Sequence, residues 1–302
     1  MKTVYCIGEA LIDFTPLDGG KSFQQNPGGA PANVAATVAK LGGTSQMITQ
    51  VGDDVFGHYL IDEMKKNYVD TKYVSTSSLY QTSLAFVSLD EEGNRSFSFY
   101  RENAADLMMD PNDYDFSMFK KDDILHFCSV NLVDSPSRET HRKAINQMKS
   151  IGGHISFDPN LRFPLWKDKD ELKAIVLEFI KVSNILKISD EELFFITGIE
   201  DESDALLSLL RDDVQLIIYT KGSEGIRYYS YNHDISVDGT KVSVVDTTGA
   251  GDASIGSVLY YLQTNGINLS SSQIEEMLKL SNKVAGITCT NFGGMSAVPD
   301  LR

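Results

Sequence analysis

The sequence predicts an α/β fold: a doubly wound, mostly parallel sheet flanked by helices, with a small β-sheet attached as a lid. Apolar strand patterns alternate with helical patterns along most of the chain, which is the order of a parallel sheet. Residues 82–100 instead alternate apolar and polar residues on both sides of an Asp-Glu-Glu-Gly-Asn turn, which predicts a hairpin with one solvated face. We therefore expect one α/β domain over residues 1–302, with a lid formed by insertions at about 14–26 and 82–103.

The first half of the chain begins with an apolar strand that meets two acids, Glu9 and Asp13, where a core strand should have ended. The segment at 14–26 lacks a helical period, so we expect it to join the hairpin in the small sheet. Either Asp53 or Asp54 can cap the second helix. The expected elements that follow the first strand are a helix at 32–43, a strand at 46–52 and a helix at 53–67.

The second half of the chain resumes the alternation of strands and helices. The expected strands are 124–130, 154–160, 185–189, 214–222 and 224–231. The expected helices are 137–153, 169–183, 190–198, 251–266 and 272–291. Neither half contains an internal repeat or a low-complexity linker, so the pattern indicates one core domain with a lid grown from its loops.

Composition excludes several classes of protein. The 27 Lys and Arg against 42 Asp and Glu give a net charge of -15, which disfavours nonspecific binding to nucleic acid or to an anionic membrane. Three widely spaced cysteines indicate a reducing compartment without disulfides, and five histidines without ligand spacing argue against zinc. No apolar run approaches a membrane span, so we expect a cytoplasmic protein.

The segment DTTGAGDASIG, residues 246–256, carries the clearest chemistry. Its Gly-Ala-Gly run keeps side chains away from the backbone, so the N–H groups at the start of the following helix can converge on a phosphate. Asp252 then lies in the first turn of that helix, where a carboxylate can act as a base toward an attacking hydroxyl. The alternative is a tight turn with an acidic helix cap.

The chain resembles the PfkB, or ribokinase-like, family of carbohydrate kinases, and within it the bacterial fructokinases. PGGAPANVA at 27–35 is similar to the family's N-terminal signature, and DTTGAGDA at 246–253 to its C-terminal one. FYRENAAD at 99–106 and FDPNLRFPLW at 157–166 look like segments that fructokinases share. The resemblance covers nearly the whole chain and implies an ATP-dependent transfer of phosphate to a sugar, most simply fructose to fructose 6-phosphate.

The resemblance also assigns residues. Asp252 is the expected catalytic base, with the backbone of Gly249, Ala250 and Gly251 as the hole for the transferring phosphoryl group. The expected substrate-binding residues are Asp13, Gly28, Gly29, Asn33, Arg101, Asp158, Asn160 and Arg162. Two glycines let a polyol approach the backbone, while Asp and Asn exchange hydrogen bonds with its hydroxyls. Arg101 is expected to reach the sugar from the lid, and either Arg101 or Arg162 can instead form a structural ion pair.

The nucleotide and metal positions follow in the same way. The expected ATP-side residues are Lys187, Ser189, Lys221, Gly222, Gly225 and Asn282. Ser189 stands where the family usually has Asn. Glu192 is expected to order Mg²⁺ through solvent, unless it only caps a helix. A site for a monovalent cation, K⁺, is expected from Asp246, Thr248, Thr288, Asn291 and Gly293.

Other functions remain open at this point. An acidic substrate such as 2-keto-3-deoxygluconate would need Arg162 or Arg101 for its carboxylate. A nucleoside kinase fits the fructokinase-like segments less well, a non-catalytic sugar-binding regulator would not need Asp252, and a Rossmann dehydrogenase would need a GxGxxG that GEALID lacks. An exposed lid edge also favours pairing in a homodimer.

Overall fold

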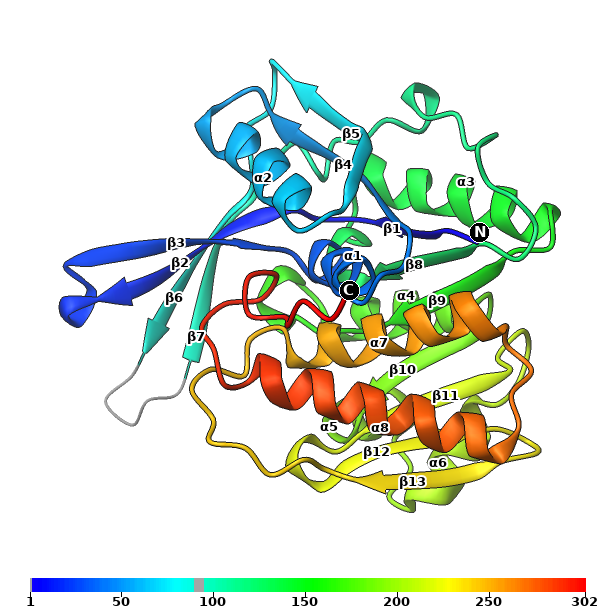
Figure 1. Cartoon of the computed structure of the whole chain (residues 1–302). Helices are drawn as coiled ribbons and strands as arrows, with labels where there is room; N and C mark the ends of the chain where they lie inside the picture. Colours follow the sequence, from blue (N-terminus) through cyan, green and yellow to red (C-terminus); the bar gives the residue numbers. More distant parts are fainter. Residues whose placement is uncertain (1, 90–94) are drawn as a thin grey trace.

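A nine-stranded sheet forms the centre of the computed structural model, which describes residues 2–89 and 95–302 (Figure 1). The strand order is β13-β12-β11-β10-β9-β8-β1-β4-β5; all neighbours are parallel except that β12 is antiparallel to both β11 and β13. The strands are β1 (Val4–Ile7), β4 (Ser45–Gly52), β5 (Asp70–Ser77), β8 (Ile124–Cys128), β9 (His154–Asp158), β10 (Ile185–Ser189), β11 (Leu216–Thr220), β12 (Gly225–Tyr229) and β13 (Asp234–Asp238).

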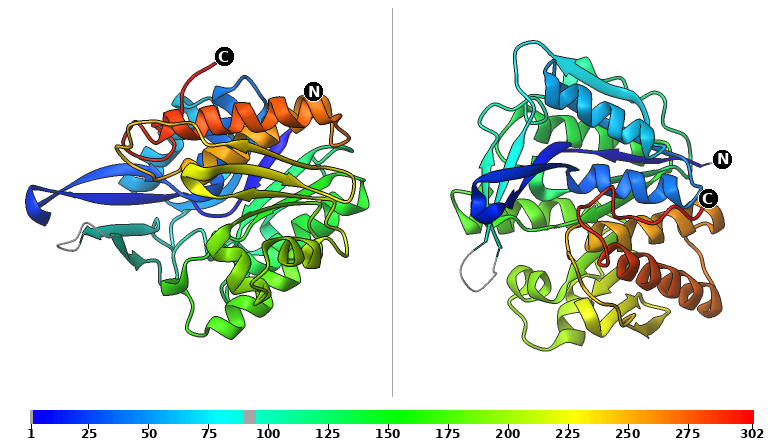
Figure 2. Two further views of the ribbon diagram at one scale, coloured as in Figure 1. Left: turned by 90° about the horizontal axis from the view of Figure 1, so that it is seen from below. Right: turned by 60° about the vertical axis from the view of Figure 1, so that its left-hand side comes forward.

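Helices cover both faces of this sheet, as the left view of Figure 2 shows. One face packs against α1 (Ala30–Lys40), α2 (Val55–Lys66), α7 (Ala250–Asn265) and α8 (Ser271–Thr288). The other packs against α3 (Pro136–Ser150), α4 (Lys169–Ile180), α5 (Asp190–Thr197) and α6 (Glu202–Leu209). Strand β1 shows why both faces are apolar: Val4 and Cys6 enter one core, and Tyr5 and Ile7 enter the other.

Four strands form a second sheet, here called the lid sheet, which projects beyond the main sheet in Figure 1. Its order is β3-β2-β6-β7, with β2 (Leu11–Leu17), β3 (Ser22–Gly28), β6 (Leu84–Leu89) and β7 (Arg95–Tyr100). Strands β6 and β7 pair antiparallel as the hairpin pattern predicts, whereas the predicted turn at 90–94 lies outside the described residues. The predicted α/β fold with a small β-lid is therefore confirmed.

The sequence pattern did not predict three elements of the structure. Strands β5 and β13 are the two edges of the main sheet, and their residues are half-buried or exposed, so neither shows an apolar run. Helix α6 has only eight residues and begins at an acidic cap, Asp201, whose side chain accepts the N–H of Asp204. Edge position and short length removed the periodicity on which sequence-based assignment depends.

The strand order reverses beside β1, because the chain first adds β4 and β5 on one side and then β8 to β13 on the other. In open α/β sheets ligands bind at the carboxyl ends of the strands near such a reversal. Glu9 follows β1 at that edge, and Asp158 and Ser189 end β9 and β10. Among the described helices, none combines the length and the apolar character needed to cross a membrane.

Candidate active site

A cavity of about 300 Å³ opens where the lid sheet meets the carboxyl edge of the main sheet. Its walls include Asp13 from β2, Phe99 from β7 and Asp158 from β9, so both sheets contribute. The cavity brings together these predicted residues: Asp13, Gly29, Asn33, Asp158, Asn160, Arg162, Lys187, Thr248, Gly249, Gly251 and Asp252. Segments that lie far apart in the chain thus meet around one space of small-molecule size.

Helix α7 presents its N-terminus to the cavity. Gly249 is the N-cap and has φ 77, and a Cβ added there would lie 2.8 Å from the Cα of Gly294. Glycine is therefore required by both conformation and space. The N–H groups of the first helical turn have no partner within the helix, so those of Gly251 and Asp252 form a place for an anion. Ala250 does not line the cavity, and its N–H donates to the Thr247 carbonyl oxygen.

Asp252 is 9% exposed and receives a 2.8 Å hydrogen bond from the Asn33 amide. Burial raises the pKa of Asp252 above its ordinary value, while the Asn33 bond and the charges of Lys187 and Arg162 oppose the rise. Asn33 belongs to α1 and Asp252 to α7, so the packing of two helices fixes the carboxylate. A carboxylate with a raised pKa beside an anion site can accept a proton from an alcohol.

Asp13 lies across the same cavity on β2. Burial raises the pKa of Asp13 to about 7; Arg162 opposes this rise and Asp252 adds to it. Gly28 lies against the Asp13 side chain, because a Cβ at Gly28 would come within 2.1 Å of the Asp13 carboxylate. Gly29 has φ 105, and a Cβ there would lie 2.4 Å from the Glu9 carbonyl oxygen. The two glycines thus make room for Asp13 and for the turn into α1.

Lys187 and Asp158 form a buried ion pair, 3.1 Å apart, and both line the cavity. Burial raises the pKa of Asp158 to about 7 against the opposing charge of Lys187. Burial alone would lower the pKa of Lys187, but Asp158 and Glu192 outweigh it and hold the pKa above its ordinary value. A Cβ at Gly251 would lie 3.4 Å from the Lys187 ammonium, so a fixed positive charge stands next to the start of α7.

Comparison with known proteins agrees with this geometry. The family model described as pfkB family carbohydrate kinase matches residues 1–301. The chain belongs to the PfkB family of carbohydrate kinases. It is 39% identical over 306 residues to fructokinase-2 of Oryza sativa subsp. japonica, covering 99% of this chain and 91% of the relative.

Solved structures of fructokinases are also similar to this chain in sequence and fold. A double mutant of fructokinase from Vibrio cholerae O395, in fructose, ADP and potassium ion bound form, is 35% identical with a TM-score of 0.91, covering 100% of this chain and 96% of the other. Fructokinase from Xylella fastidiosa with bound ATP is 31% identical with a TM-score of 0.91, covering 98% and 95%. This PfkB chain is thus a carbohydrate kinase that is similar to fructokinases over its whole length.

Glu192 of this PfkB kinase lies outside the residues that line the cavity. Its two carboxylate oxygens accept the N–H groups of Ser189 and Leu161, each at 2.9 Å, and the Ser189 hydroxyl accepts the Glu192 N–H at 3.4 Å. Burial would raise the pKa of Glu192, but Lys187 and these hydrogen bonds lower it. The pair forms a capping box at the start of α5, which is the helix-capping alternative left open by the sequence.

The predicted nucleotide-side residues beyond Lys187 lie outside the cavity. Lys221 pairs with Glu202 at 3.0 Å, and Asn282 donates to the carbonyl oxygens of Val237 and Asp238 at 3.2 and 2.9 Å. Both Gly222 and Gly225 have positive φ, and only Gly225 is also crowded by a neighbouring strand. These residues stabilise the edge formed by β11, β12 and β13.

The predicted cation residues join two loops. The Asp246 carboxylate accepts the N–H of Thr248 at 2.8 Å and the N–H of Gly293 at 3.1 Å. Thr288 and Asn291 donate their side chains to the Val284 and Ile287 carbonyl oxygens of α8. Within the described ranges, no group of three or more His, Cys, Asp or Glu side chains could hold a metal ion. Asp246 therefore connects the loop before α7 with the loop after α8.

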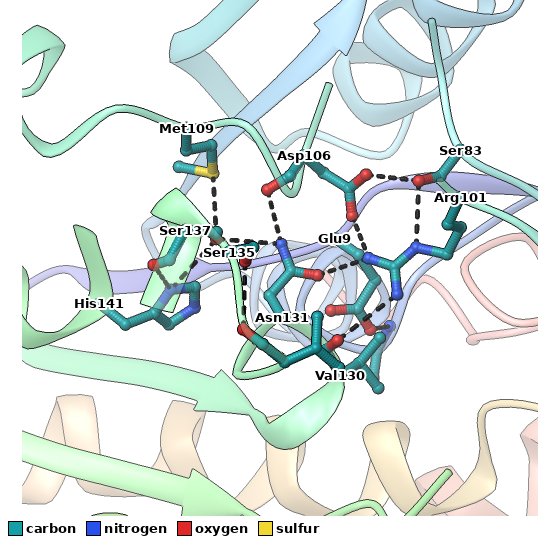
Figure 3. A network of polar contacts seen from close by, with 12 residues as sticks. Glu9, Ser83, Arg101, Asp106, Met109, Val130, Asn131, Ser135, Ser137 and His141 are labelled. Atoms are coloured by element: carbon teal, nitrogen blue, oxygen red, sulfur yellow. Dashed lines mark hydrogen bonds and ion pairs between the residues drawn. The ribbon is translucent and has the colours of Figure 1, made fainter. Parts of the chain in front are cut away.

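The structure places Arg101 in an ion pair, which the sequence left open as the alternative to a contact with the sugar. Arg101 is 5% exposed, and its guanidinium pairs with Asp106 and donates to Asn131 at 2.7 Å and Ser83 at 3.1 Å, as Figure 3 shows. It also donates to the Val130 carbonyl oxygen at 3.4 Å and does not line the cavity. Arg101 directly follows β7, so this network anchors the end of the lid sheet in the core.

Several cavity residues were missed by the sequence reasoning: Glu9, Leu11, Ala30, Phe99, Val130 and Thr247. Glu9 carried a signal, because an acid interrupts an apolar strand pattern there. Thr247 lies inside the recognised signature. Leu11, Phe99 and Val130 are ordinary apolar residues, and only the folded chain shows which apolar residues face a ligand.

Arg101→Ala is expected to lower the free energy of unfolding by about 3–5 kcal/mol, because Asp106, 1% exposed, would keep a buried charge without its partner. Urea unfolding measures the loss. Arg142→Ala is the control, since Arg142 forms a partly exposed pair with Glu178 at 2.7 Å and should cost only about 0–1 kcal/mol. Equal losses in the two variants would contradict the anchoring role of Arg101.

Proposed function

We propose that this kinase transfers the terminal phosphoryl group of ATP to the 6-hydroxyl of fructose, with Asp252 as the base. The observation that carries the proposal is the position of Asp252: held by Asn33, buried, and next to the open N-terminus of α7 in a cavity that also contains Asp13. The relatives named above include a fructokinase bound to fructose and ADP and another bound to ATP, which supports the choice of substrates.

In the proposed reaction the sugar hydroxyl gives its proton to Asp252 as its oxygen attacks the terminal phosphorus. The new O–P bond forms while the bond to ADP breaks, so the products are the sugar phosphate and ADP. The N–H groups of Gly251 and Asp252 and the ammonium of Lys187 stabilise the charge of the transferring group. Leu11 and Phe99 line the cavity from the lid sheet and exclude water.

Metal ions belong to the same proposal. Mg²⁺ bound with ATP would supply charge neutralisation for the transferring phosphoryl group. Each oxygen of Glu192 accepts one N–H and keeps a further lone pair, which suits contact with such an ion through water. For K⁺, the Asp246 carboxylate joins the two loops by accepting the N–H groups of Thr248 and Gly293, and carbonyl oxygens of these loops would be ligands of the type that a hard cation takes.

One assay tests the function and its alternatives. ADP formation is measured with ATP, Mg²⁺ and KCl against fructose, glucose, ribose and 2-keto-3-deoxygluconate, with KCl replaced by choline chloride in a parallel arm. We expect turnover with fructose, and a slower rate without K⁺. ADP release no faster than the blank with every sugar would overturn the proposal, and calorimetric sugar binding without ADP would favour a non-catalytic module.

An acidic substrate is the second candidate, because Arg162 lines the cavity and could bind a carboxylate. Four acidic side chains line the same cavity, namely Glu9, Asp13, Asp158 and Asp252. Asp158 is paired with Lys187 and the cavity also receives the phosphoryl group, itself an anion, so these acids do not decide between the substrates; the similarity to fructokinases favours the neutral sugar over the keto acid. Preferential turnover of 2-keto-3-deoxygluconate in the same assay would reverse this choice.

The acidic limb of the kcat/KM profile should lie above the ordinary pKa of Asp, because the base must be unprotonated and burial raises the pKa of Asp252. Asn33→Ala removes a hydrogen bond that lowers this pKa. The acidic limb of the variant is therefore expected at higher pH, since a smaller fraction of the base is ionised at a given acidic pH. Initial rates at low fructose across pH measure the shift.

Ser257→Ala is the control for this profile, since Ser257 is buried on α7, its hydroxyl donates within the helix to the Ala253 carbonyl oxygen, and it is not among the described residues that line the cavity. The acidic limb of the Ser257→Ala profile should lie at the same pH as that of the natural enzyme. An Asn33→Ala limb that stays in place or moves to lower pH would contradict the hydrogen bond as the cause.

A further inference from the structure

Glu9 is a cavity residue that the reaction above leaves without a role. It lies between β1 and β2, is 2% exposed and lines the same cavity as Asp13 and Asp252. Burying an acid is costly unless its oxygens find partners. Packing alone therefore does not explain why this acid lies at a ligand cavity.

The two oxygens of Glu9 differ in what they contact. Oε1 accepts the N–H of Ala30 at 2.9 Å, at the first residue of α1. Oε2 is buried and has no hydrogen-bond partner among the described residues. One oxygen thus fixes the side chain against the signature loop, and the other is left with its acceptor sites unfilled.

Arg101 donates no hydrogen bond to Oε2 of Glu9. Figure 3 shows Glu9 beside Arg101, whose guanidinium donates to Asp106, Asn131, Ser83 and the Val130 carbonyl oxygen. The arginine influences Glu9 only by charge: burial raises the pKa of Glu9 to about 7, and Arg101 together with the backbone N–H groups of Glu9 and Ala30 opposes that rise. An unsatisfied buried acceptor is costly, and a ligand hydroxyl at this position would offset that cost.

We propose that Glu9 is a further sugar-recognition residue, in which Ala30 fixes Oε1 and Oε2 exchanges a hydrogen bond with one hydroxyl of the bound sugar. At a pH above the pKa of Glu9 the carboxylate accepts the hydroxyl proton in a charge-assisted hydrogen bond, which is stronger than the bond that a neutral amide NH₂ group could donate in its place. The inference rests on the proposed sugar kinase function and extends it from the reacting hydroxyl to the recognition of a second one.

Glu9→Gln tests the proposal, because glutamine keeps an oxygen for the Ala30 N–H and replaces Oε2 by an NH₂ group of similar size. Binding is measured by calorimetry, and KM and kcat by ADP formation, for fructose and for analogues that each lack one hydroxyl: 1-deoxy-, 3-deoxy- and 4-deoxyfructose and 2,5-anhydromannitol. We expect the Kd and KM for fructose to rise about tenfold or more, with a smaller change in kcat.

The analogues distinguish the loss of one sugar contact from a general structural effect of the substitution. If Oε2 forms a hydrogen bond with one hydroxyl, the analogue that lacks this hydroxyl binds the natural enzyme and the variant equally. Each of the other analogues binds the variant more weakly than it binds the natural enzyme. Unchanged fructose binding, or the same loss with every analogue, would overturn the proposal and leave Glu9 as a loop support or the holder of a trapped water.

Asp123→Asn is the matched control: Asp123 is buried, accepts the N–H groups of Thr3 and Lys120, and precedes β8 at the opposite edge of the sheet. It should bind all the sugars as the natural enzyme does. If Glu9→Gln does not fold, a crystal of the natural enzyme with fructose decides, since no sugar hydroxyl within hydrogen-bond distance of Oε2 would overturn the proposal. Failure of the natural enzyme to phosphorylate any sugar would instead remove the proposed function.

Discussion

Asp252→Asn is expected to lower kcat for sugar phosphorylation by about 10²–10⁴-fold while leaving sugar and ATP binding nearly unchanged. The amide has the size of the carboxylate and still offers an oxygen to the Asn33 amide, but it cannot accept the proton of the attacking hydroxyl. Steady-state rates give kcat, and calorimetry with fructose gives the binding constant.

The same substitution should not weaken the fold. Burial disfavours the ionised form of Asp252, as its raised pKa shows, so a neutral amide removes an unfavourable charge. We expect a free energy of unfolding equal to or above that of the natural protein at pH 8. A folded variant that keeps its kcat would contradict the role of Asp252 as base, and a variant that unfolds would contradict the expected stability.

The start of α7 could be predicted from sequence because its requirements are local. A run of small residues followed by an acid and an apolar helical pattern describes a helix N-terminus that is open to an anion, and the folded chain has Gly249 as N-cap and Asp252 in the first turn. The main sheet was predictable for the same reason, since each buried strand carries its own apolar run.

The role of Arg101 could not be predicted in this way. Its partner Asp106 lies five residues away, but Ser83 and Asn131 come from other parts of the chain, and a sequence shows a charge without showing what neutralises it. Glu9 is the reverse case: the sequence marked it as an anomaly, yet only the fold shows that Oε1 has a partner and Oε2 has none. Long-range polar contacts are thus the part of a site that pattern and composition leave undetermined.

Gly249→Ala is expected to lower kcat by about 10²-fold or more and to destabilise the protein by about 1–2 kcal/mol or more. The left-handed conformation at φ 77 is unfavourable for alanine, and its Cβ would approach the Gly294 Cα to 2.8 Å. Because Gly294 meets this Cβ with a backbone atom, the clash is relieved only if the first turn of α7 moves. A shift of the N–H groups of Gly251 and Asp252 misaligns the stabilising donors and the base together.

Gly198→Ala separates the two causes. Gly198 ends α5 with φ 69, close to the value at Gly249, but a Cβ there would meet no atom of the described residues within 4 Å. Both variants therefore carry the same conformational penalty in urea unfolding, and only Gly249→Ala adds a displacement of the helix start. If kcat falls in Gly249→Ala and stays unchanged in Gly198→Ala, the position of the α7 N-terminus controls phosphoryl transfer. If the two variants keep the same kcat, the transferring group must be stabilised elsewhere, because a site that depends on aligned N–H groups cannot tolerate their displacement.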